Sequence, residues 1–396
     1  MSARPEARFI PFARPSIGTE EEQAVLAVLR SGWLTTGEVA AAFEQEFAQA
    51  VGSRHALAVN SATAGLHLSL ESLGVERETV VITTPYTFAA TAEVIRYLGA
   101  DPLFVDIDAA TLNIDPDTVE RALDSCRAAG RRVTAILPVH VAGLPCDMAR
   151  IGGLARAHGV PVVEDAAHAF PVRVGERFAG TLGDAGVYSF YATKTITTGE
   201  GGMVATDRDD VASRIRIMRL HGIDRDIWNR YTSPQASWRY DVVAPGFKYN
   251  LTDIAAALGR VQLARADELL ARRRHIAGRY LELLAGLDGV ELPHSAVEHA
   301  WHLFILRIRD GALSIDRDRF IEELRAGGIG ASVHFIPLHL MSYYRERYGL
   351  RPQDFPVSLD CSRRCLSLPL YPSMSDDEVQ RVAAAVIGTC RRFTSS

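Results

Sequence analysis

The sequence predicts an α/β protein with a large domain built on a mostly parallel sheet and a smaller α+β domain after it. Between residues 55 and 205, short β-rich apolar runs alternate with longer amphipathic stretches, which is the pattern of a sheet covered by helices. The chain has 396 residues, roughly 2.6 times a 150-residue unit, which fits one large domain with an appendage or two domains. Its hydrophobic share of 47% and charged share of 23% are those of folded globular proteins and argue against disorder.

Seven strands are expected in the large domain, with helices between them. Apolar and β-branched runs predict the strands at 55–59, 79–83, 102–105, 133–139, 160–165, 186–190 and 202–206. Three- and four-residue spacing of apolar side chains predicts helices at 63–73, 87–98, 117–129 and 147–159. The last two strands follow one another without a helix of normal length between them, so we expect them to form a reversed or inserted part of the sheet.

The second half of the chain predicts a linker region and the smaller domain. A basic helix is expected at 207–222, and a long loop rich in Trp, Tyr, Arg, Ser and Pro at 223–250, a length typical of a functional or contact surface. A long or kinked helical stretch over 251–287 joins the domains. The small domain then contains strands at 301–308 and 331–335 and helices at 317–330 and 374–390, the last with Ser375 as its cap. We place the large domain, with an N-terminal arm, at 1–255 and the small domain at 256–396.

Charge and composition exclude several classes of function. The formal net charge of −5 provides no global positive field for nucleic acid or an anionic membrane, so an anionic ligand must be held locally. No uncharged apolar stretch reaches the ~18 residues of a membrane span, and no apolar segment of a signal peptide follows the charged start, so a cytoplasmic location is expected. The five cysteines are few and odd in number, as for reduced thiols. Cys361 and Cys365 could form half of a zinc site, but no second pair at ligand spacing accompanies them, so we expect no metal.

The strongest chemical signal lies between residues 160 and 204. Asp165 ends an apolar strand, where α/β folds place ligand-contacting groups, although it could also serve as a helix cap. Lys194 lies among threonines and glycines rather than among the charged residues that usually surround a solvated lysine. A buried lysine amine has a lowered pKa and can form a Schiff base with an aldehyde cofactor.

Pyridoxal phosphate requires three further features, and the sequence offers a candidate for each. A carboxylate must pair with the pyridine nitrogen, and Asp165 is the candidate. Residues 60–65, Asn-Ser-Ala-Thr-Ala-Gly, offer hydroxyls and free amides for a phosphate at the start of a helix, although they would also suit a simply well-capped helix. Phe88, after the next strand, could stack on the ring or could be an ordinary core aromatic.

These motifs and others in the same order resemble the DegT/DnrJ/EryC1/StrS aminotransferases. Members of this family are fold-type I pyridoxal-phosphate enzymes that aminate keto sugars attached to nucleotides. The resemblance covers nearly the whole chain and is carried by residues 10–22, 60–67, 83–91, 138–148, 163–169, 189–203, 220–222, 247–263, 299–307, 333–349 and 367–374.

The resemblance implies roles for residues around the cofactor. Lys194 would form the Schiff base and shuttle a proton during transamination, and Asp165 would pair with the pyridine nitrogen. Phe88 would cover one face of the ring. His168 stands near the cofactor's phenolic oxygen, where many relatives have glutamine, and histidine is seen in the branch that acts on UDP-4-keto pentoses. The phosphate would be held by Ala62, Thr63 and Ser189.

The resemblance also implies a homodimer with shared active sites. Asn250 would reach the phosphate of the neighbouring subunit, and the 223–250 loop is the candidate for the exchanged contact. His334 lies where the small domain of relatives closes over the nucleotide sugar. Arg219 and Lys248 could meet the diphosphate or could equally be surface charges. The run 272–274, three arginines, predicts a solvated helix face.

The sequence therefore predicts a transaminase that moves the amino group of L-glutamate onto a nucleotide-linked keto sugar. Residues 247–254, residues 299–304 and His168 are most similar to enzymes that make UDP-4-amino-4-deoxy-L-arabinose, a sugar used to modify lipid A. Relatives with histidine in place of the lysine are dehydratases, so Lys194 favours transamination. The alternatives are an aminotransferase for another keto-6-deoxy hexose or an aminocyclitol precursor, a cofactor-binding regulator without turnover, and a different lysine-dependent enzyme such as a decarboxylase or desulfurase.

Overall fold

Residues 55–206 contain a mixed sheet, which the computed structural model describes together with the rest of residues 9–224, 240–296 and 298–395. One part of this sheet has the order β1-β9-β8-β5 and the other the order β3-β2-β4. Parallel bridges from Ile136 to Val162 and from Val139 to Asp165 join the two parts edge to edge. The strands are β1 (His55–Val59), β2 (Val80–Thr83), β3 (Asp101–Phe104), β4 (Val133–Ile136), β5 (Val163–Asp165), β8 (Ala185–Ser189) and β9 (Gly202–Thr206).

Strand β9 is antiparallel to both of its neighbours, whereas the other paired strands of the mixed sheet are parallel. It is antiparallel to both β8 and β1, while β5 pairs with β8, and β2 with β3 and β4, in parallel. Of the last two strands, for which a reversed or inserted arrangement was expected, β9 is reversed, whereas β8 is parallel to β5. A parallel partner would need a crossover helix, whereas an antiparallel return needs only the segment 190–201 that joins β8 to β9.

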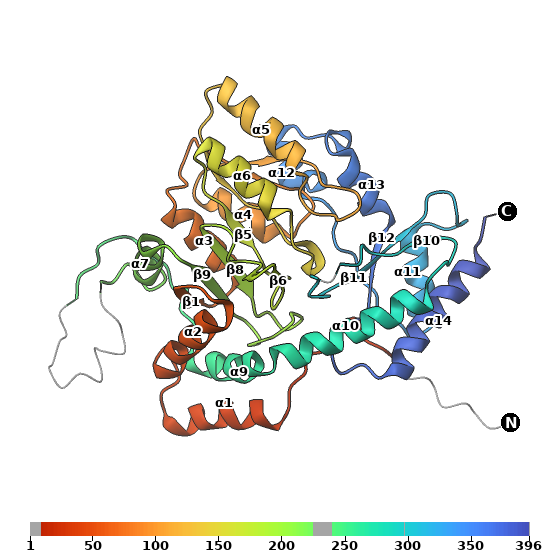
Figure 1. The fold of residues 1–396 in the computed structure, drawn as a ribbon, viewed down its shortest axis with the longest axis horizontal. Helices are drawn as coiled ribbons and strands as arrows, with labels where there is room; N and C mark the ends of the chain where they lie inside the picture. The colour runs from red at the N-terminus through yellow and green to blue at the C-terminus, as the bar shows by residue number, and fades with distance from the viewer. Residues whose placement is uncertain (1–8, 225–239, 297, 396) are drawn as a thin grey trace.

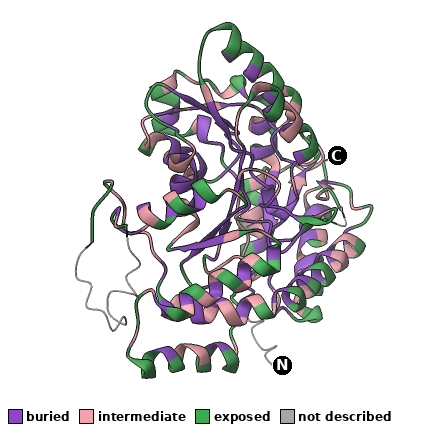
Figure 2. Cartoon of the chain, turned by 60° about the vertical axis from the view of Figure 1, so that its left-hand side comes forward, coloured by how far each residue is buried: buried purple, intermediate pink, exposed green. Residues whose placement is uncertain are grey.

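Both faces of the sheet are covered, as the alternation of side chains requires. In β1, Leu57 and Val59 belong to one apolar cluster and Ala56 and Ala58 to another. The first cluster includes residues of α3 (Ala62–Ser72), α4 (Ala89–Tyr97) and α7 (Asp209–Met218), and the second includes Phe43 and Phe47 of α2 (Glu38–Val51). Helices α5 (Pro116–Ala128) and α6 (Met148–His158) share a further cluster with β2 and β4. Figure 2 shows the purple, buried strands inside and the green, exposed residues on the outer helix faces.

The predicted long helix over 251–287 is two helices, α9 (Asp253–Ala264) and α10 (Ala266–Leu283), separated at Arg265. Helix α9 packs on α1 (Thr19–Ser31) and α2, whereas α10 packs on α14 (Asp376–Arg392). Figure 1 shows α9 and α10 running end to end along the molecule. The division into domains at 255 and 256 stays a prediction.

The C-terminal part contains a three-stranded antiparallel sheet with helices packed against it. The strand order is β10 (Val290–Glu291), β11 (Phe304–Ile308) and β12 (Cys365–Leu368), and helix α11 (Arg317–Ala326) shares its apolar cluster with α10 and α14. Ser375 caps α14, as expected, with Glu378 completing a capping box. The shorter elements are β6 (Arg173–Val174), β7 (Arg177–Phe178), α12 (Ser342–Tyr348), α13 (Pro356–Arg364) and the 3-10 turns η1 (Val141–Gly143), η2 (Leu338–Leu340) and η3 (Pro352–Asp354).

One predicted strand is wrong. Residues 331–335 form no strand and make only the single bridge between Ser332 and Ser367. The segment that pairs with β11 at this edge is β12, whose four residues are all buried, whereas residues 331–334 are half-buried. The edge with the more complete apolar burial therefore pairs with β11.

Two further expectations from the sequence can be compared with the structure. All five cysteines are buried and free, which agrees with reduced thiols. Among the described residues no helix is both long enough and apolar enough to cross a membrane. Of the predicted loop at 223–250, residues 225–239 lie outside the described residues.

A buried carboxylate from α9 caps the start of α2. Asp253 is 2% exposed, and its Oδ1 accepts hydrogen bonds from the amides of Gly37 (2.7 Å) and Ala40 (2.9 Å), while Oδ2 accepts one from Val39 (3.3 Å). Asp253→Ala removes the acceptor of all three amides, so we expect the free energy of unfolding to fall by about 2–3 kcal/mol. Urea unfolding measures this loss.

The matched control is Asp267→Ala, which removes an exposed acidic residue from the first turn of α10. We expect the control to change the free energy of unfolding by less than about 0.5 kcal/mol. Equal losses for the two variants would show that Asp253 stabilises α9 through its own helix dipole and not α2 through its amides.

Candidate active site

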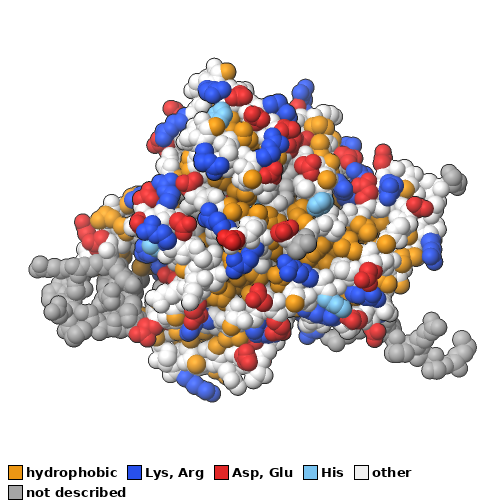
Figure 3. All heavy atoms as spheres, in the orientation of Figure 1, with side chains coloured by type: hydrophobic (Ala, Val, Ile, Leu, Met, Phe, Trp, Pro, Cys, Tyr) orange, Lys and Arg blue, Asp and Glu red, His pale blue; other side chains and the backbone are white. Residues whose placement is uncertain are grey.

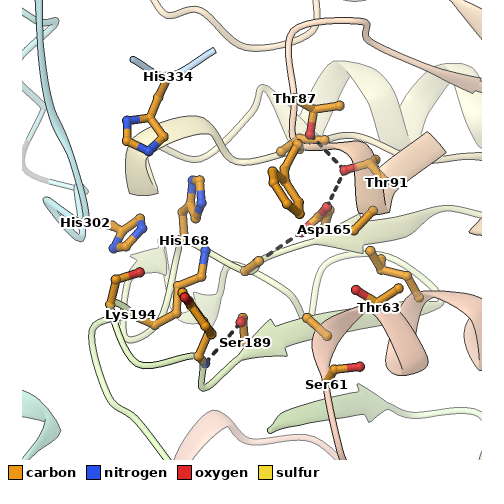
Figure 4. A pocket seen from close by; sticks show the side chains of 18 of the residues that line it. Ser61, Thr63, Thr87, Thr91, Asp165, His168, Ser189, Lys194, His302 and His334 are labelled. Carbon is orange, nitrogen blue, oxygen red and sulfur yellow. Dashed lines mark hydrogen bonds between the residues drawn. The ribbon is translucent and has the colours of Figure 1, made fainter. Parts of the chain in front are cut away.

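A cavity of about 510 Å³ lies at the carboxyl ends of β5 and β8, next to the start of α3. This is the edge of an α/β sheet where ligands bind, and the volume is that of a small-molecule site. Its wall contains seven of the residues predicted from the sequence: Ala62, Thr63, Phe88, Asp165, His168, Ser189 and Lys194, together with His334 from the predicted substrate site. Figure 4 shows the Lys194 amine pointing toward His168, with Asp165, Thr63 and Ser61 across the cavity.

Lys194 lies in the segment that returns the chain from β8 to β9. Its amide donates to the carbonyl of Tyr191 (2.9 Å), and the Thr197 hydroxyl donates to the carbonyl of Phe190 (3.0 Å), so the segment folds back on itself. Gly199, with φ of 80°, makes the turn that a residue with a Cβ would adopt only under strain. Burial lowers the pKa of the Lys194 amine from 10.5 to about 8, and the nearby Asp165 carboxylate opposes part of that shift.

Asp165 lies at the end of β5 and is 5% exposed. Its Oδ2 accepts a hydrogen bond from the Thr91 hydroxyl (2.8 Å), which also bonds to the Thr87 hydroxyl (2.8 Å). Oδ1 accepts from the amide of Ala167 (3.2 Å), so the capping interpretation was partly correct, although residues 166–169 form turns and not a helix. Burial raises the pKa of the Asp165 carboxyl, and the Thr91 hydrogen bond opposes this by stabilising the carboxylate.

The start of α3 forms a cradle of amides beside Lys194 and Asp165. Ser61 is the N-cap, and its Oγ accepts from the amide of Ala64 (3.1 Å). The amides of Ala62 and Thr63 belong to the first turn, where backbone donors have no acceptor within the helix and the helix dipole favours an anion. Gly202 permits this arrangement, because a Cβ there would lie 2.7 Å from the amide nitrogen of Ala62. The predicted phosphate cup is therefore both a capped helix and an anion site.

Three histidines close the cavity opposite the cradle. The ring of His168 lies 4.4 Å from that of His302 and stacks on Phe335 at 6.1 Å, and His334 Nδ1 bonds to the Ser367 hydroxyl (2.8 Å). Burial lowers the pKa of His168 and His302 well below 6.5, and that of His334 to about 4, with the Lys194 ammonium adding to each shift. These imidazoles are therefore neutral beside the lysine.

Three other predicted site residues lie outside the cavity, and Phe88 lines it but is open to solvent. Phe88 lines the cavity with 67% of its surface exposed, so its ring is free to contact a ligand. Asn250 and Lys248 do not line the cavity; Lys248 Nζ donates to Asn250 Oδ1 (2.7 Å), and Asn250 Nδ2 donates to Thr36 (2.6 Å). Arg219 also lies outside, where its guanidinium forms a half-buried pair with Glu44 and bonds to the carbonyl of Ala58.

Two residues of the site, Thr91 and His302, were not predicted from the sequence. Thr91 is one turn after Phe88 on α4 and holds Asp165, so its spacing from the predicted ring-stacking residue was an available signal. His302 is brought beside His168 only by tertiary packing, although it lies in a motif, 299–307, that carried the family resemblance.

The arrangement fits an aldehyde cofactor that carries a phosphate. It combines an amine of lowered pKa, a buried carboxylate and an amide cradle at a helix start around one cavity. His168 Nδ1 is buried and has no hydrogen-bond partner among the described residues, so the wall holds an unused polar atom. Within the same part of the chain, no group of three or more His, Cys, Asp or Glu side chains could hold a metal ion.

The chain belongs to the DegT/DnrJ/EryC1/StrS aminotransferase family, whose model matches residues 15–387. It is 48% identical to the uncharacterized protein MJ1066 of Methanocaldococcus jannaschii over 96% of this chain and 97% of that protein. It is 46% identical to the spore coat polysaccharide biosynthesis protein SpsC of Bacillus subtilis over 96% of each chain. Among solved structures, the putative sugar aminotransferase Spr1654 of Streptococcus pneumoniae matches with a TM-score of 0.88 and 32% identity over 97% of this chain and 99% of that one.

These findings confirm the enzyme class, the cofactor and the fold predicted from the sequence. The chain is a pyridoxal-phosphate-dependent aminotransferase with the fold-type I architecture. The individual roles of the site residues remain proposals.

The lowered pKa of Lys194 predicts how its amine reacts in the cofactor-free chain. The sequence contains two lysines, Lys194 and Lys248, so competitive acetylation followed by mass spectrometry can follow each separately. We expect the acetylation of Lys194 to be half-maximal at a pH of about 8, because burial destabilises the ammonium. Lys248 serves as the internal reference for reagent concentration.

The Asp165→Asn variant tests the electrostatic coupling in the same assay. The carboxylate favours the ammonium form of Lys194, so its removal should move the midpoint of acetylation to a lower pH. A midpoint that rises, or one that already lies near 10.5 in the unaltered chain, would contradict the description of the site.

Proposed function

We propose that this aminotransferase moves the amino group of L-glutamate onto the keto carbon of UDP-4-keto-pentose, giving UDP-4-amino-4-deoxy-L-arabinose. The observation that carries the transamination chemistry is the single cavity in which Lys194, Asp165 and the start of α3 meet. A cytoplasmic location and a homodimer are part of the same proposal.

The cofactor would be held at both of its ends by groups already in place. Ala62, Thr63 and Ser189 line the cavity, so the free amides of the first turn of α3 and the Ser189 hydroxyl would bind the phosphate. The Asp165 carboxylate, fixed by Thr91, would bind the protonated pyridine nitrogen, and Phe88 would cover one face of the ring. Bound pyridoxal phosphate supplies a ring that accepts electrons from the carbon bearing the amino group.

Lys194 would move the proton that transamination requires. A pKa of about 8 leaves about a tenth of the amine neutral at pH 7, so this form can accept a proton, and the ammonium formed can return one. The neutral imidazoles of His168, His302 and His334 do not add positive charge beside it. The same side chain can therefore act as base and as acid in both half-reactions.

The sugar part of the proposal is supported by the relatives and by His168. Spr1654 is described as a sugar aminotransferase and SpsC as a polysaccharide biosynthesis protein. His168 lines the cavity at the position that the sequence analysis linked to UDP-4-keto pentoses. His334, on the loop that closes the cavity from the small-domain side, is the candidate for contact with the sugar.

A different keto sugar is the second candidate. The 46% identity to SpsC extends over 96% of both chains, and that protein is named for a spore coat polysaccharide and not for a lipid. This name favours a sugar of a polysaccharide, and the alternative acceptor that we propose is a nucleotide-linked keto-6-deoxy hexose. Both candidates use the same cavity and the same donor.

The homodimer would complete each site with residues of the neighbouring subunit. Lys248 and Asn250 lie outside their own cavity, and the segment that carries them is bonded to the end of β1, through the carbonyl of Tyr249 and the amide of Asn60 (2.8 Å). This places both side chains beside the residue that precedes the amide cradle. Lys248 is exposed and available to a partner's ligand. Arg219 is not included in the proposed substrate site, because Glu44 already pairs with it.

The substrate proposal is tested by the visible spectrum of the purified enzyme with pyridoxal phosphate. L-glutamate should bleach the yellow band by converting the cofactor to its amine form, and UDP-4-keto-pentose should restore the band while the amino sugar is detected by mass spectrometry. Recovery with a keto-6-deoxy hexose and not with the pentose would establish the second candidate.

Lys194→Ala is the control for both steps. It should show the same unfolding transition as the unaltered chain but neither bleaching by L-glutamate nor steady-state turnover, because no other lysine lies in the cavity wall. Turnover by this variant would remove Lys194 from its proposed role.

Shared active sites predict complementation between two inactive variants. When Lys194→Ala and Asn250→Ala subunits are mixed and allowed to exchange, half of the dimers are mixed and each contains one intact site. Activity should therefore recover to about a quarter of that of the unaltered dimer. Light scattering establishes the dimer, and no recovery after proven exchange would mean that Asn250 acts within its own subunit or not at all.

A further inference from the structure

The arginine run at 272–274 is not a uniform solvated face, as the sequence analysis expected. Arg272 bonds to Asp376 (2.8 Å) and to the carbonyl of Met374 (2.6 Å) at the surface. Arg273, in contrast, is 2% exposed and belongs to the buried stripe of α10, between Leu269 or Leu270 and Ile276 or Ala277. Its three- and four-residue spacing from these apolar side chains was the signal for burial.

The Arg273 guanidinium donates its hydrogen bonds to backbone carbonyls. Nη1 lies 3.0 Å from the carbonyl oxygen of Leu370, 3.3 Å from that of Trp301 and 3.5 Å from that of His302. Nη2 lies 3.4 Å from the carbonyl oxygen of Lys194. In the described ranges no carboxylate forms an ion pair with this group, and Nε has no hydrogen-bond partner there.

Burying a cation without a carboxylate partner in the apolar stripe of a helix is unfavourable for the free energy of folding. Burial lowers the pKa of the Arg273 guanidinium to about 10, which measures the cost of taking its charge out of water. A leucine or methionine would fill the same stripe without that cost. What the guanidinium adds is a rigid fork of donors that reaches three separate chain segments at once.

Two of the four carbonyls belong to residues that line the active-site cavity. Lys194 and His302 both do so, and the ring of His302 lies against that of His168. The guanidinium therefore lies behind the cavity wall and bonds the backbone of the reactive lysine to the backbone of the histidine cluster. Burial is the main cause of the lowered pKa of His302, and the positive charges of Lys194 and Arg273 add to it.

We propose that Arg273 is a positioning residue of the active site: it holds the backbones of Lys194 and His302 in the relative placement that directs the amine at the cofactor. The proposal rests on the proposed role of Lys194. It is independent of the identity of the sugar, because it concerns the half-reaction with L-glutamate.

The test compares Arg273→Met, which keeps the volume and removes the charge and the donors, with Arg272→Met on the same helix as the matched control. The urea-unfolding midpoint is measured first for both. Single-turnover bleaching of the bound cofactor by L-glutamate should slow by about 10- to 100-fold in Arg273→Met, because a small displacement of a reacting group costs that much. The KM for L-glutamate should change by less than about 3-fold, and Arg272→Met should match the unaltered enzyme in both.

A second measurement does not depend on activity. In the full-length, cofactor-free chain with labelled histidines, the His302 imidazole should titrate at a higher pH in Arg273→Met than in the unaltered chain, because a neighbouring positive charge has been removed. Arg273→Lys separates the two effects. It keeps the charge but not the fork of donors, so His302 should titrate as in the unaltered chain while the half-reaction is slowed.

Three outcomes would overturn the proposal. The first is an unaltered rate of bleaching in Arg273→Met, and the second is an unaltered titration of His302. The third is loss of folding in both Arg273→Met and Arg273→Lys, which would assign Arg273 to the stability of the fold. Failure of the enzyme to accept UDP-4-keto-pentose would leave all of these measurements interpretable, since none of them uses the sugar.

Discussion

The site depends on an amine and a carboxylate that are withdrawn from water into the same cavity. Burial lowers the pKa of Lys194 and raises that of Asp165, so each group is shifted toward its neutral form. Each charge also stabilises the other, which limits both shifts. The result is a lysine with a pKa of about 8, close enough to neutral pH for it to lose and regain a proton during a reaction.

The sheet brings these two groups together. Parallel pairing of β5 with β8 places Asp165 opposite Val187, so the carboxylate and the start of the Lys194 segment leave the sheet at the same edge. From Lys194 the chain returns along the same edge to Gly202, the first residue of the antiparallel strand β9. The absence of a side chain at Gly202 lets the start of α3 approach. Amine, carboxylate and amide cradle thus follow from one reversal of strand direction. Figure 3 shows acidic and basic side chains interspersed over one face of the molecule. This agrees with anion binding by groups within the site and not by a positive field of the whole protein.

What the sequence could predict was local, and what it could not predict was the partner of each group. Lys194, Asp165 and residues 60–65 are recognisable because their neighbours in the chain are unusual for a lysine, an aspartate and a helix start. The Thr91 hydroxyl that holds Asp165 is 74 positions away, and the Glu44 that pairs with Arg219 is 175 positions away. A pattern along the chain shows that Arg219 is a cation but not that it is already paired. The same limit applies to residues 331–335, which are β-rich in composition but form no strand. The more deeply buried segment β12 pairs with β11.

The kind of cation matters as much as its place. Of the 43 basic residues, 41 are arginines, whose guanidinium stays protonated and does not form a Schiff base with an aldehyde. One of the two lysines, Lys248, is exposed and bonded to Asn250, which leaves Lys194 as the lysine amine in the cavity wall. Arg273, directly behind the Lys194 carbonyl, supplies a positive charge and hydrogen bonds without the reactivity of an amine, so of these two cations Lys194 is the one that can form a Schiff base.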